Sequence, residues 1–177
     1  EYESFYDVPE MPCLNLEPGS PARAHLLEVA RYWLLFGGDG YRLDYANGPA
    51  REFWVEFQQA CQEVNPDCWT FGEVVAPADE LISFAGSMHG TLDFLTCQAL
   101  RETFATGNWS LSRLAAYLEN YWAAYPREFS RPAFIDNHDM NRFFFTAEGS
   151  VSAQEAALRL LYLMPGPPIV YYGSERE

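Results

Sequence analysis

Hydrophobic residues along this chain form two alternating kinds of segment: short apolar runs and longer stretches with helical spacing. The apolar runs predict five strands, at about residues 40–45, 69–75, 91–95, 132–136 and 168–172. Hydrophobic residues three and four apart predict helices at 21–36, 49–64, 97–105, 111–124 and 152–163, with a short helix at 78–85. Strands that alternate with helices are typical of an α/β fold with a parallel sheet.

The residues at the ends of these segments support the first boundary. Ser20 and Pro21 suit the N-cap and the first position of a helix, and Gly37 suits its end. The stretch before Ser20 is acidic, rich in aromatic residues and interrupted by three prolines. We therefore expect residues 1–19 to form an ordered loop and the alternating pattern to begin at residue 20.

The first strand carries a candidate catalytic acid. Side chains two apart on a strand share a face, so Arg42 and Asp44 are expected to point the same way. A neighbouring guanidinium favours the ionised form of a carboxyl group, so we expect Asp44 to be a carboxylate at the C-terminal end of its strand. On this segment alone, a structural Arg–Asp pair is an equally good interpretation.

Two further acids occur at matching places in later strands. Glu73 follows Asp44 by about one βαβ repeat of roughly 30 residues, and Asp139 follows Glu73 by about two. In α/β folds, side chains at the C-terminal ends of parallel strands gather at one edge of the sheet. The spacing therefore favours a functional interpretation, in which the three acids share one pocket.

The segments around these acids resemble signature segments of the α-amylase superfamily, glycoside hydrolase family 13. The three segments are Tyr41–Asp44 (YRLD), Phe71–Val75 (FGEVV) and Phe134–Asp139 (FIDNHD). Two more agree in order and spacing: Met11–Asn15 resembles the motif before the fourth barrel strand, and Pro165–Glu175 the segment on the eighth. The resemblance covers nearly the whole chain, and its nearest branch is that of cyclomaltodextrinase, neopullulanase and oligo-1,6-glucosidase.

The resemblance implies a fold and a domain organisation. The fold is the C-terminal portion of a (β/α)8 TIM barrel, from about strand four to strand eight. Residues 1–19 are then a loop arriving from a preceding inserted domain, and residues 20–177 are part of the catalytic barrel. An incomplete barrel exposes strand edges, through which the chain could self-associate.

The resemblance also implies roles for individual residues. Asp44 is the nucleophile, Glu73 the general acid/base and Asp139 the transition-state stabiliser, while Arg42 supports the nucleophile and His138 binds substrate. Further pocket-lining candidates, with weaker support, are Tyr45, Asn47, Arg142 and Tyr172. Gly48 and Val75 depart from the pattern, since the family often carries a larger residue at the position of Gly48. The resemblance therefore says least about the subsites that receive the leaving sugar.

Composition narrows the partners and cofactors. The chain has 25 acidic and 11 basic residues and a formal net charge of −14, which disfavours nucleic acid and anionic membrane surfaces as partners. The four cysteines lack the spacing of a zinc site and are expected to be buried thiols, with a Cys61–Cys68 bridge as an alternative. We assign no metal and require no cofactor. Calcium in the full-length protein stays open, and nothing in the sequence assigns a cellular location.

These observations lead to one expected function and one alternative. We expect a retaining glycoside hydrolase that acts on α-glucosidic bonds of starch-like sugars, with or without transglycosylation, and no activity from these 177 residues alone. The substrate stays open among starch, cyclodextrin, α-1,6-linked oligosaccharides, sucrose and trehalose. The alternative is a non-catalytic barrel used as a binding scaffold. Because such relatives typically lose one or more of the three acids, their presence here favours the enzyme.

Overall fold

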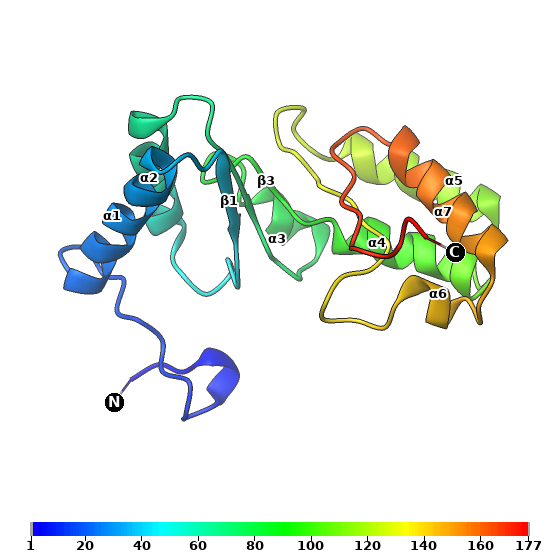
Figure 1. Cartoon of the computed structure of the whole chain (residues 1–177), viewed down its shortest axis with the longest axis horizontal. Helices are drawn as coiled ribbons and strands as arrows, with labels where there is room; N and C mark the ends of the chain where they lie inside the picture. Colours follow the sequence, from blue (N-terminus) through cyan, green and yellow to red (C-terminus); the bar gives the residue numbers. More distant parts are fainter. Residues whose placement is uncertain (1, 177) are drawn as a thin grey trace. The chain divides into compact units, whose positions relative to one another are not determined.

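The computed structural model describes residues 2–176 and divides into two compact units, each described by itself (Figure 1). Unit 1 contains the residues up to Val74 together with Phe84–His89, and unit 2 contains Val75–Ser83 and the residues from Gly90 onward. The chain within these units follows the expected alternation of helices and parallel strands.

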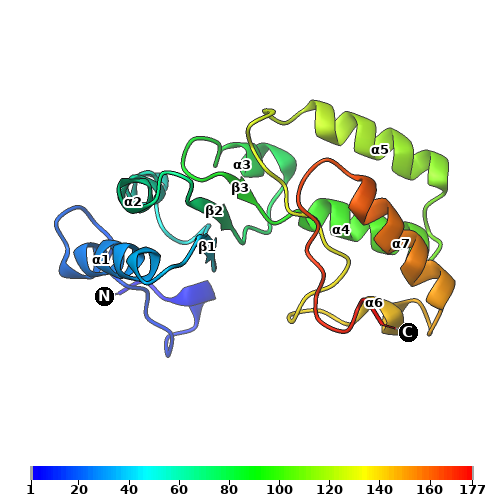
Figure 2. The ribbon, with the colours of Figure 1, turned by 45° about the horizontal axis from the view of Figure 1, so that its top comes forward.

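Unit 1 begins with a short 3-10 helix and then forms two helix–strand pairs. Its elements are η1 (Phe5–Asp7), α1 (Pro21–Leu35), β1 (Gly40–Leu43), α2 (Arg51–Val64) and β2 (Trp69–Gly72). The side chain of Ser20 accepts a hydrogen bond from the backbone N–H of Arg23, which confirms the predicted start of α1. The second helix was expected from residue 49 and begins at Arg51, after the extended residue Ala50. Helices α1 and α2 pack side by side (Figure 2).

The two strands of unit 1 run parallel and in a fixed register. Gly40 pairs with Trp69, and Leu43 pairs with Gly72, so both strands end at the same level. A side chain at position 40 would lie 2.0 Å from the carbonyl oxygen of Trp69, so only glycine allows this close pairing. Both strands are shorter than expected, yet their parallel pairing confirms the predicted topology.

Unit 2 is mainly helical in the part of the chain that the structure describes. Its elements are α3 (Ala78–Ile82), β3 (Gly90–Thr91), α4 (Phe94–Leu100), the π-helix η2 (Arg101–Ala105), α5 (Leu111–Ala123), α6 (Phe143–Thr146) and α7 (Val151–Leu163). Helices α4, α5 and α7 gather around one core (Figure 2), whose buried residues include Leu100, Leu114, Phe143 and Leu161.

The other three predicted strands depart further from expectation than β1 and β2. The predicted strand 91–95 ends after two residues, because the Asp93 carboxylate accepts the backbone N–H of Thr96 at 2.9 Å and starts α4. The helix expected over 97–105 therefore begins at Phe94 and ends in a π-helical turn. The segments 132–136 and 168–172 form no ladder, only the isolated bridge Ala133↔Pro168.

Proline explains why the last two segments are not regular strands. Pro132, Pro167 and Pro168 have no backbone N–H to donate. The backbone hydrogen bonds between the two segments are therefore those of Ala133. The Ala133 N–H donates to Pro167 O at 3.2 Å, and the Ile169 N–H donates to Ala133 O at 2.7 Å. The segments still run parallel and side by side, in the order that successive barrel strands require.

Candidate active site

The candidate acids of unit 1 share one guanidinium. Arg42 Nη1 lies 2.5 Å from Asp44 Oδ1, and Arg42 Nη2 lies 2.8 Å from Glu73 Oε1. The predicted pairing of Arg42 with Asp44 is thus confirmed, and the pairing with Glu73 is an addition that the sequence did not reveal. We call Arg42, Asp44 and Glu73 the Arg42 cluster.

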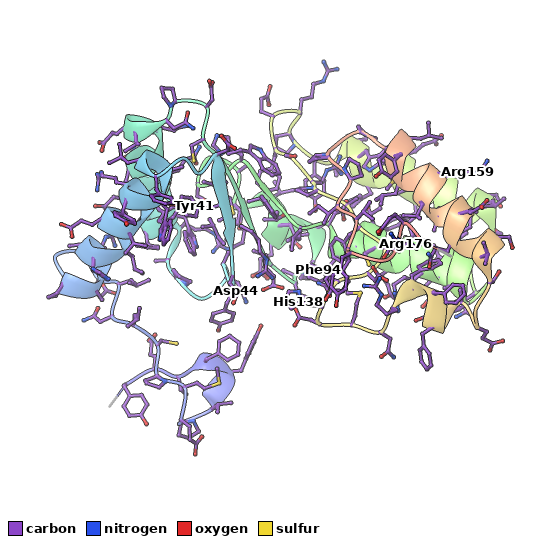
Figure 3. The ribbon with its side chains drawn as sticks, viewed as in Figure 1. Tyr41, Asp44, Phe94, His138, Arg159 and Arg176 are labelled. Carbon is purple, nitrogen blue, oxygen red and sulfur yellow. The ribbon has the colours of Figure 1, made fainter. Side chains whose placement is uncertain are left out.

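The register of β1 and β2 brings the two acids together. Asp44 directly follows Leu43, and Glu73 directly follows Gly72, its partner across the ladder. Backbone bonds continue past the strands: the Glu73 N–H donates to Leu43 O at 2.8 Å, and the Ala46 N–H donates to Glu73 O at 3.0 Å. Figure 3 shows Asp44 at the end of β1. The predicted places of Asp44 and Glu73 at the C-terminal ends of parallel strands are confirmed, and the two strands are neighbours.

The two carboxylates differ in their access to solvent. The Asp44 side chain is 75% exposed, whereas that of Glu73 is 19% exposed. Two acids at adjacent strand ends in unlike surroundings can take different chemical roles, one attacking carbon and the other moving a proton. This arrangement suits hydrolysis of a glycosidic bond.

The turn after Asp44 carries the pocket candidates Tyr45 and Asn47, both half-buried. Tyr45 has a positive φ of 46°, which is uncommon for a residue with a side chain. Its backbone N–H donates to Glu73 Oε2 at 3.4 Å, and its carbonyl accepts the N–H of Gly48 at 3.0 Å. The structure therefore places Tyr45 directly beside the Arg42 cluster.

The candidate residues His138 and Asp139 lie in unit 2, on a tight turn (Figure 3 labels His138). The Asn137 side chain accepts the backbone N–H of Asp139 at 3.0 Å, and His138 Nε2 lies 3.1 Å from Asp139 Oδ2. Adjacent residues on a regular strand would face opposite ways. The turn places both side chains together, as a shared role requires.

Arg142 and Tyr172 also come together in unit 2. Arg142 Nη2 donates to the carbonyl oxygen of Tyr172 at 2.8 Å and lies 3.1 Å from the hydroxyl of Ser174. Its guanidinium also lies over the ring of Tyr171, 4.6 Å from the centroid. His138, Arg142 and Tyr172 line one shallow pocket.

Asp136 is a buried residue next to Arg142 whose structural role the sequence analysis missed. Its carboxylate is buried and accepts the backbone N–H of Phe143 at 2.8 Å and the hydroxyl of Ser174 at 2.9 Å. Arg142 Nε lies 3.5 Å from the same carboxylate. The sequence contained one signal for this role: an acid at the end of the apolar run 134–136. A carboxylate buried there needs hydrogen-bond donors around it.

The gathering of all three acids in one pocket stays a prediction, since Asp44 and Glu73 belong to unit 1 and Asp139 belongs to unit 2.

Among the described residues, no group of three or more His, Cys, Asp or Glu side chains could hold a metal ion. Over the same residues, every helix is too short or too polar to cross a membrane.

The cysteines are free thiols, and three of the four are buried as predicted. Cys13 is exposed, so the prediction of burial is wrong for it: the loop before α1 leaves its side chain in solvent. Burial raises the pKa of Cys61 and of Cys97 to about 12, and burial also raises the pKa of Cys68. Buried thiols with a raised pKa are poor nucleophiles, so Cys61, Cys68 and Cys97 are structural residues.

Comparison with known proteins gives a consistent result. The family model described as "Alpha amylase, catalytic domain" matches residues 1–177. Alpha-amylase 2 of Dictyoglomus thermophilum is 32% identical over 99% of this chain and 31% of its own length. Neopullulanase 2 of Thermoactinomyces vulgaris is 31% identical over 98% of this chain and 30% of its own length. The chain thus spans about a third of the length of these curated relatives.

Solved structures agree in fold. The cyclic α-maltosyl-(1→6)-maltose hydrolase of Arthrobacter globiformis superposes with a TM-score of 0.88 at 30% identity, over 98% of this chain and 40% of that one. The α-amylase of Geobacillus thermoleovorans, solved with acarbose, gives a TM-score of 0.85 at 29% identity, over 93% of this chain and 38% of that one.

Proposed function

Because this chain belongs to the family of α-amylase catalytic domains and has the fold of the C-terminal part of a TIM barrel, we propose that it carries the catalytic acids of a retaining glycoside hydrolase. The proposed substrates are α-glucosidic bonds of starch-like oligo- or polysaccharides. The observation that carries the proposal is the Arg42 cluster, in which one guanidinium joins two acids at the ends of paired parallel strands.

The proposed reaction uses the two acids of the cluster in turn. Asp44 attacks the anomeric carbon while Glu73 gives its proton to the leaving oxygen, which breaks the glycosidic bond and forms a glucosyl ester on Asp44. Water then attacks the same carbon, Glu73 takes the proton, and the ester bond breaks to restore both acids. Asp139 and His138 hold the hydroxyl groups of the reacting sugar, and Arg42 orients both carboxylates.

The strand geometry supports net retention rather than inversion. Inverting enzymes separate their carboxyl groups by roughly 6.5–9.5 Å to admit a water, and retaining enzymes hold them about 5–5.5 Å apart. Asp44 and Glu73 follow paired residues of neighbouring strands, whose axes lie about 4.7–4.9 Å apart. Both also contact a single guanidinium, which favours the shorter separation.

Several relatives narrow the substrate class. Cyclomaltodextrinase of Geobacillus thermopakistaniensis is 32% identical to this chain over 98% of its residues. Neopullulanase 2 of Thermoactinomyces vulgaris is 31% identical over the same share. We therefore propose an oligosaccharide or cyclic α-glucan as substrate, with transfer to a second sugar as a side reaction. The other pocket residues proposed to contact this substrate are Tyr45, Asn47, Arg142 and Tyr172.

The test uses the full-length protein with maltotriose, cyclodextrin and an α-1,6-linked trisaccharide. Anomer-resolved NMR of the first product should show the α-anomer, and an initial β-anomer would refute retention. Glu73→Gln should lower kcat/KM for these sugars by about 10²–10⁴-fold. The matched control is Glu155→Gln, because Glu155 pairs only with a surface arginine, Arg159, at 3.2 Å. Binding of these sugars without any hydrolysis would favour the scaffold alternative.

A further inference from the structure

The turn between β1 and α2, which carries Asp44, is held from the helix side by a buried indole. Trp54 lies on α2 and is only 6% exposed. Its Nε1–H donates to the carbonyl oxygen of Ala46 at 2.8 Å. The N–H is the one polar group of an indole, and it needs an acceptor when it is buried. That acceptor belongs to the second residue after Asp44.

Ala46 is also fixed on the side of β2. Its N–H donates to the carbonyl oxygen of Glu73 at 3.0 Å, and the residue is fully buried. A side chain at position 72 would lie 2.8 Å from the Ala46 methyl group, so Gly72 leaves the space in which this methyl group packs. Ala46 therefore joins the turn after β1 to the end of β2 and, through Trp54, to the beginning of α2.

The position of Asp44 depends on this backbone. The Asp44 side chain is 75% exposed, with Arg42 as its ion-pair partner. The next residue, Tyr45, has a φ of 46°, a strained conformation that persists only where the surrounding structure fixes it. Its ring lies against Gly48, where any side chain would meet Cε1 at 2.4 Å, so the turn is closely packed. The two hydrogen bonds of Ala46 fix the backbone directly after Tyr45.

The indole is itself held in one orientation. The ring centroids of Phe53 and Phe57 lie 4.9 Å and 5.8 Å from that of Trp54, both in edge-to-face contact. Both phenylalanines are buried in the core of unit 1. Packing of this kind restricts rotation of the indole, so its N–H keeps its direction toward Ala46.

We propose that Trp54 is a positioning residue: through Ala46 it fixes the turn that carries Asp44 and so places this carboxylate for attack on the anomeric carbon. This inference rests on the proposed function, in which Asp44 is the nucleophile. Misplacing a reacting group by about 1 Å can lower a rate by about 10²-fold. Loss of the indole N–H should therefore lower kcat, while KM stays unchanged because the groups that bind the sugar remain.

The experiment removes the N–H from the full-length enzyme by two replacements. Benzothienylalanine at position 54 keeps the shape of the ring and has sulfur in place of the N–H, and Trp54→Phe is the second variant. Each should lower kcat for maltotriose by about 10²-fold with KM unchanged. For α-maltosyl fluoride, kcat/KM should fall by the same factor. Fluoride leaves without a proton from Glu73, so this substrate reports attack by Asp44 alone.

The matched control is Trp122→Phe, which removes the same part of an indole that packs against the core of unit 2. Urea unfolding measures the stability that each variant loses, and rates are compared at a temperature where all variants are folded. Trp122→Phe should lose stability and keep its kcat, because its ring does not contact the turn that carries Asp44.

Three results would overturn the inference. Unchanged kcat in both variants of Trp54, or an equal loss of kcat in Trp122→Phe, would leave Trp54 as a structural residue of the core. A loss confined to maltotriose would show that Trp54 acts on Glu73 and not on Asp44. Failure of the unaltered enzyme to hydrolyse maltotriose would instead refute the proposed function itself.

Discussion

Arg42 is the residue on which both proposed acids of unit 1 depend. Its two terminal nitrogens contact different carboxylates, so its planar fork sets their separation. Lysine carries the same charge on a single nitrogen and cannot span both partners.

Arg42→Lys should therefore lower kcat/KM toward maltotriose by about 10²-fold, the cost of misplacing a reacting group by roughly 1 Å. The measurement is steady-state hydrolysis by the full-length enzyme. Arg31→Lys is the control, because Arg31 pairs with Glu63 alone on the surface of unit 1. Equal rates for the two variants would show that the fork has no role in catalysis.

Asp136 holds two segments of unit 2 together through buried hydrogen bonds. One segment carries the turn with His138 and Asp139, and the other carries Tyr172 and Ser174. Asp136→Asn replaces one acceptor oxygen by a donor and leaves the Phe143 N–H or the Ser174 hydroxyl without its partner. We expect a loss of about 1–3 kcal/mol in the free energy of unfolding, measured by urea denaturation. Asp67→Asn, at an exposed position, should lose much less.

At the scale of elements, β2 depends on a histidine that must stay neutral. His89 Nδ1 accepts the backbone N–H of Thr70 at 3.1 Å, and the Gln58 side chain contacts its other ring nitrogen at 3.3 Å. Burial lowers the pKa of His89 below its ordinary value of 6.5. A protonated ring would place a hydrogen on Nδ1 and break the bond to Thr70.

The lowered pKa gives a defined dependence of stability on pH. Above pH 6.5 both folded and unfolded chains carry a neutral His89, and its full contribution is present. As pH falls below this value the unfolded chain binds a proton first, so stability decreases until the folded pKa is passed. Urea unfolding at neutral and mildly acidic pH should show this decrease.

His89→Asn should flatten that part of the pH profile, because asparagine offers an acceptor oxygen that does not titrate in this range. His25→Asn is the control, since His25 is exposed on α1. A profile that His25→Asn flattens as much as His89→Asn would remove His89 as its cause.

At the scale of the whole molecule, the chain contains only part of the proposed catalytic barrel. It spans about a third of the length of its curated relatives. We expect purified residues 1–177 to give no detectable hydrolysis of maltotriose, because subsite walls from the rest of a barrel orient the sugar. The full-length enzyme at equal concentration is the reference. Turnover by residues 1–177 alone would contradict the expectation.

The sequence predicted the alternation and the start of α1 because these depend on local signals, and it predicted the parallel pairing of the first two strands from their alternation with helices. The predictions for the last two strands were wrong because Pro132, Pro167 and Pro168 interrupt the hydrogen-bond ladder. A pattern of apolar residues does not show this loss of backbone donors. The three acids were found by their spacing, and the candidate residues beside them by the resemblance of their segments to the family. The contact of Arg42 with Glu73 depends on strand register, and the role of Asp136 depends on donors from Phe143 and Ser174. Neither could be seen in one segment.

The ring of Tyr45 lies against Gly48, so substitutions at these two positions of the turn after Asp44 are coupled. A methyl group gained first at position 48 would meet the ring at 2.4 Å, so that step is disfavoured while the tyrosine remains. Loss of the ring at position 45 opens this space, so a larger residue at position 48 causes less strain once the tyrosine is gone. The route that changes position 45 first is therefore the less strained of the two.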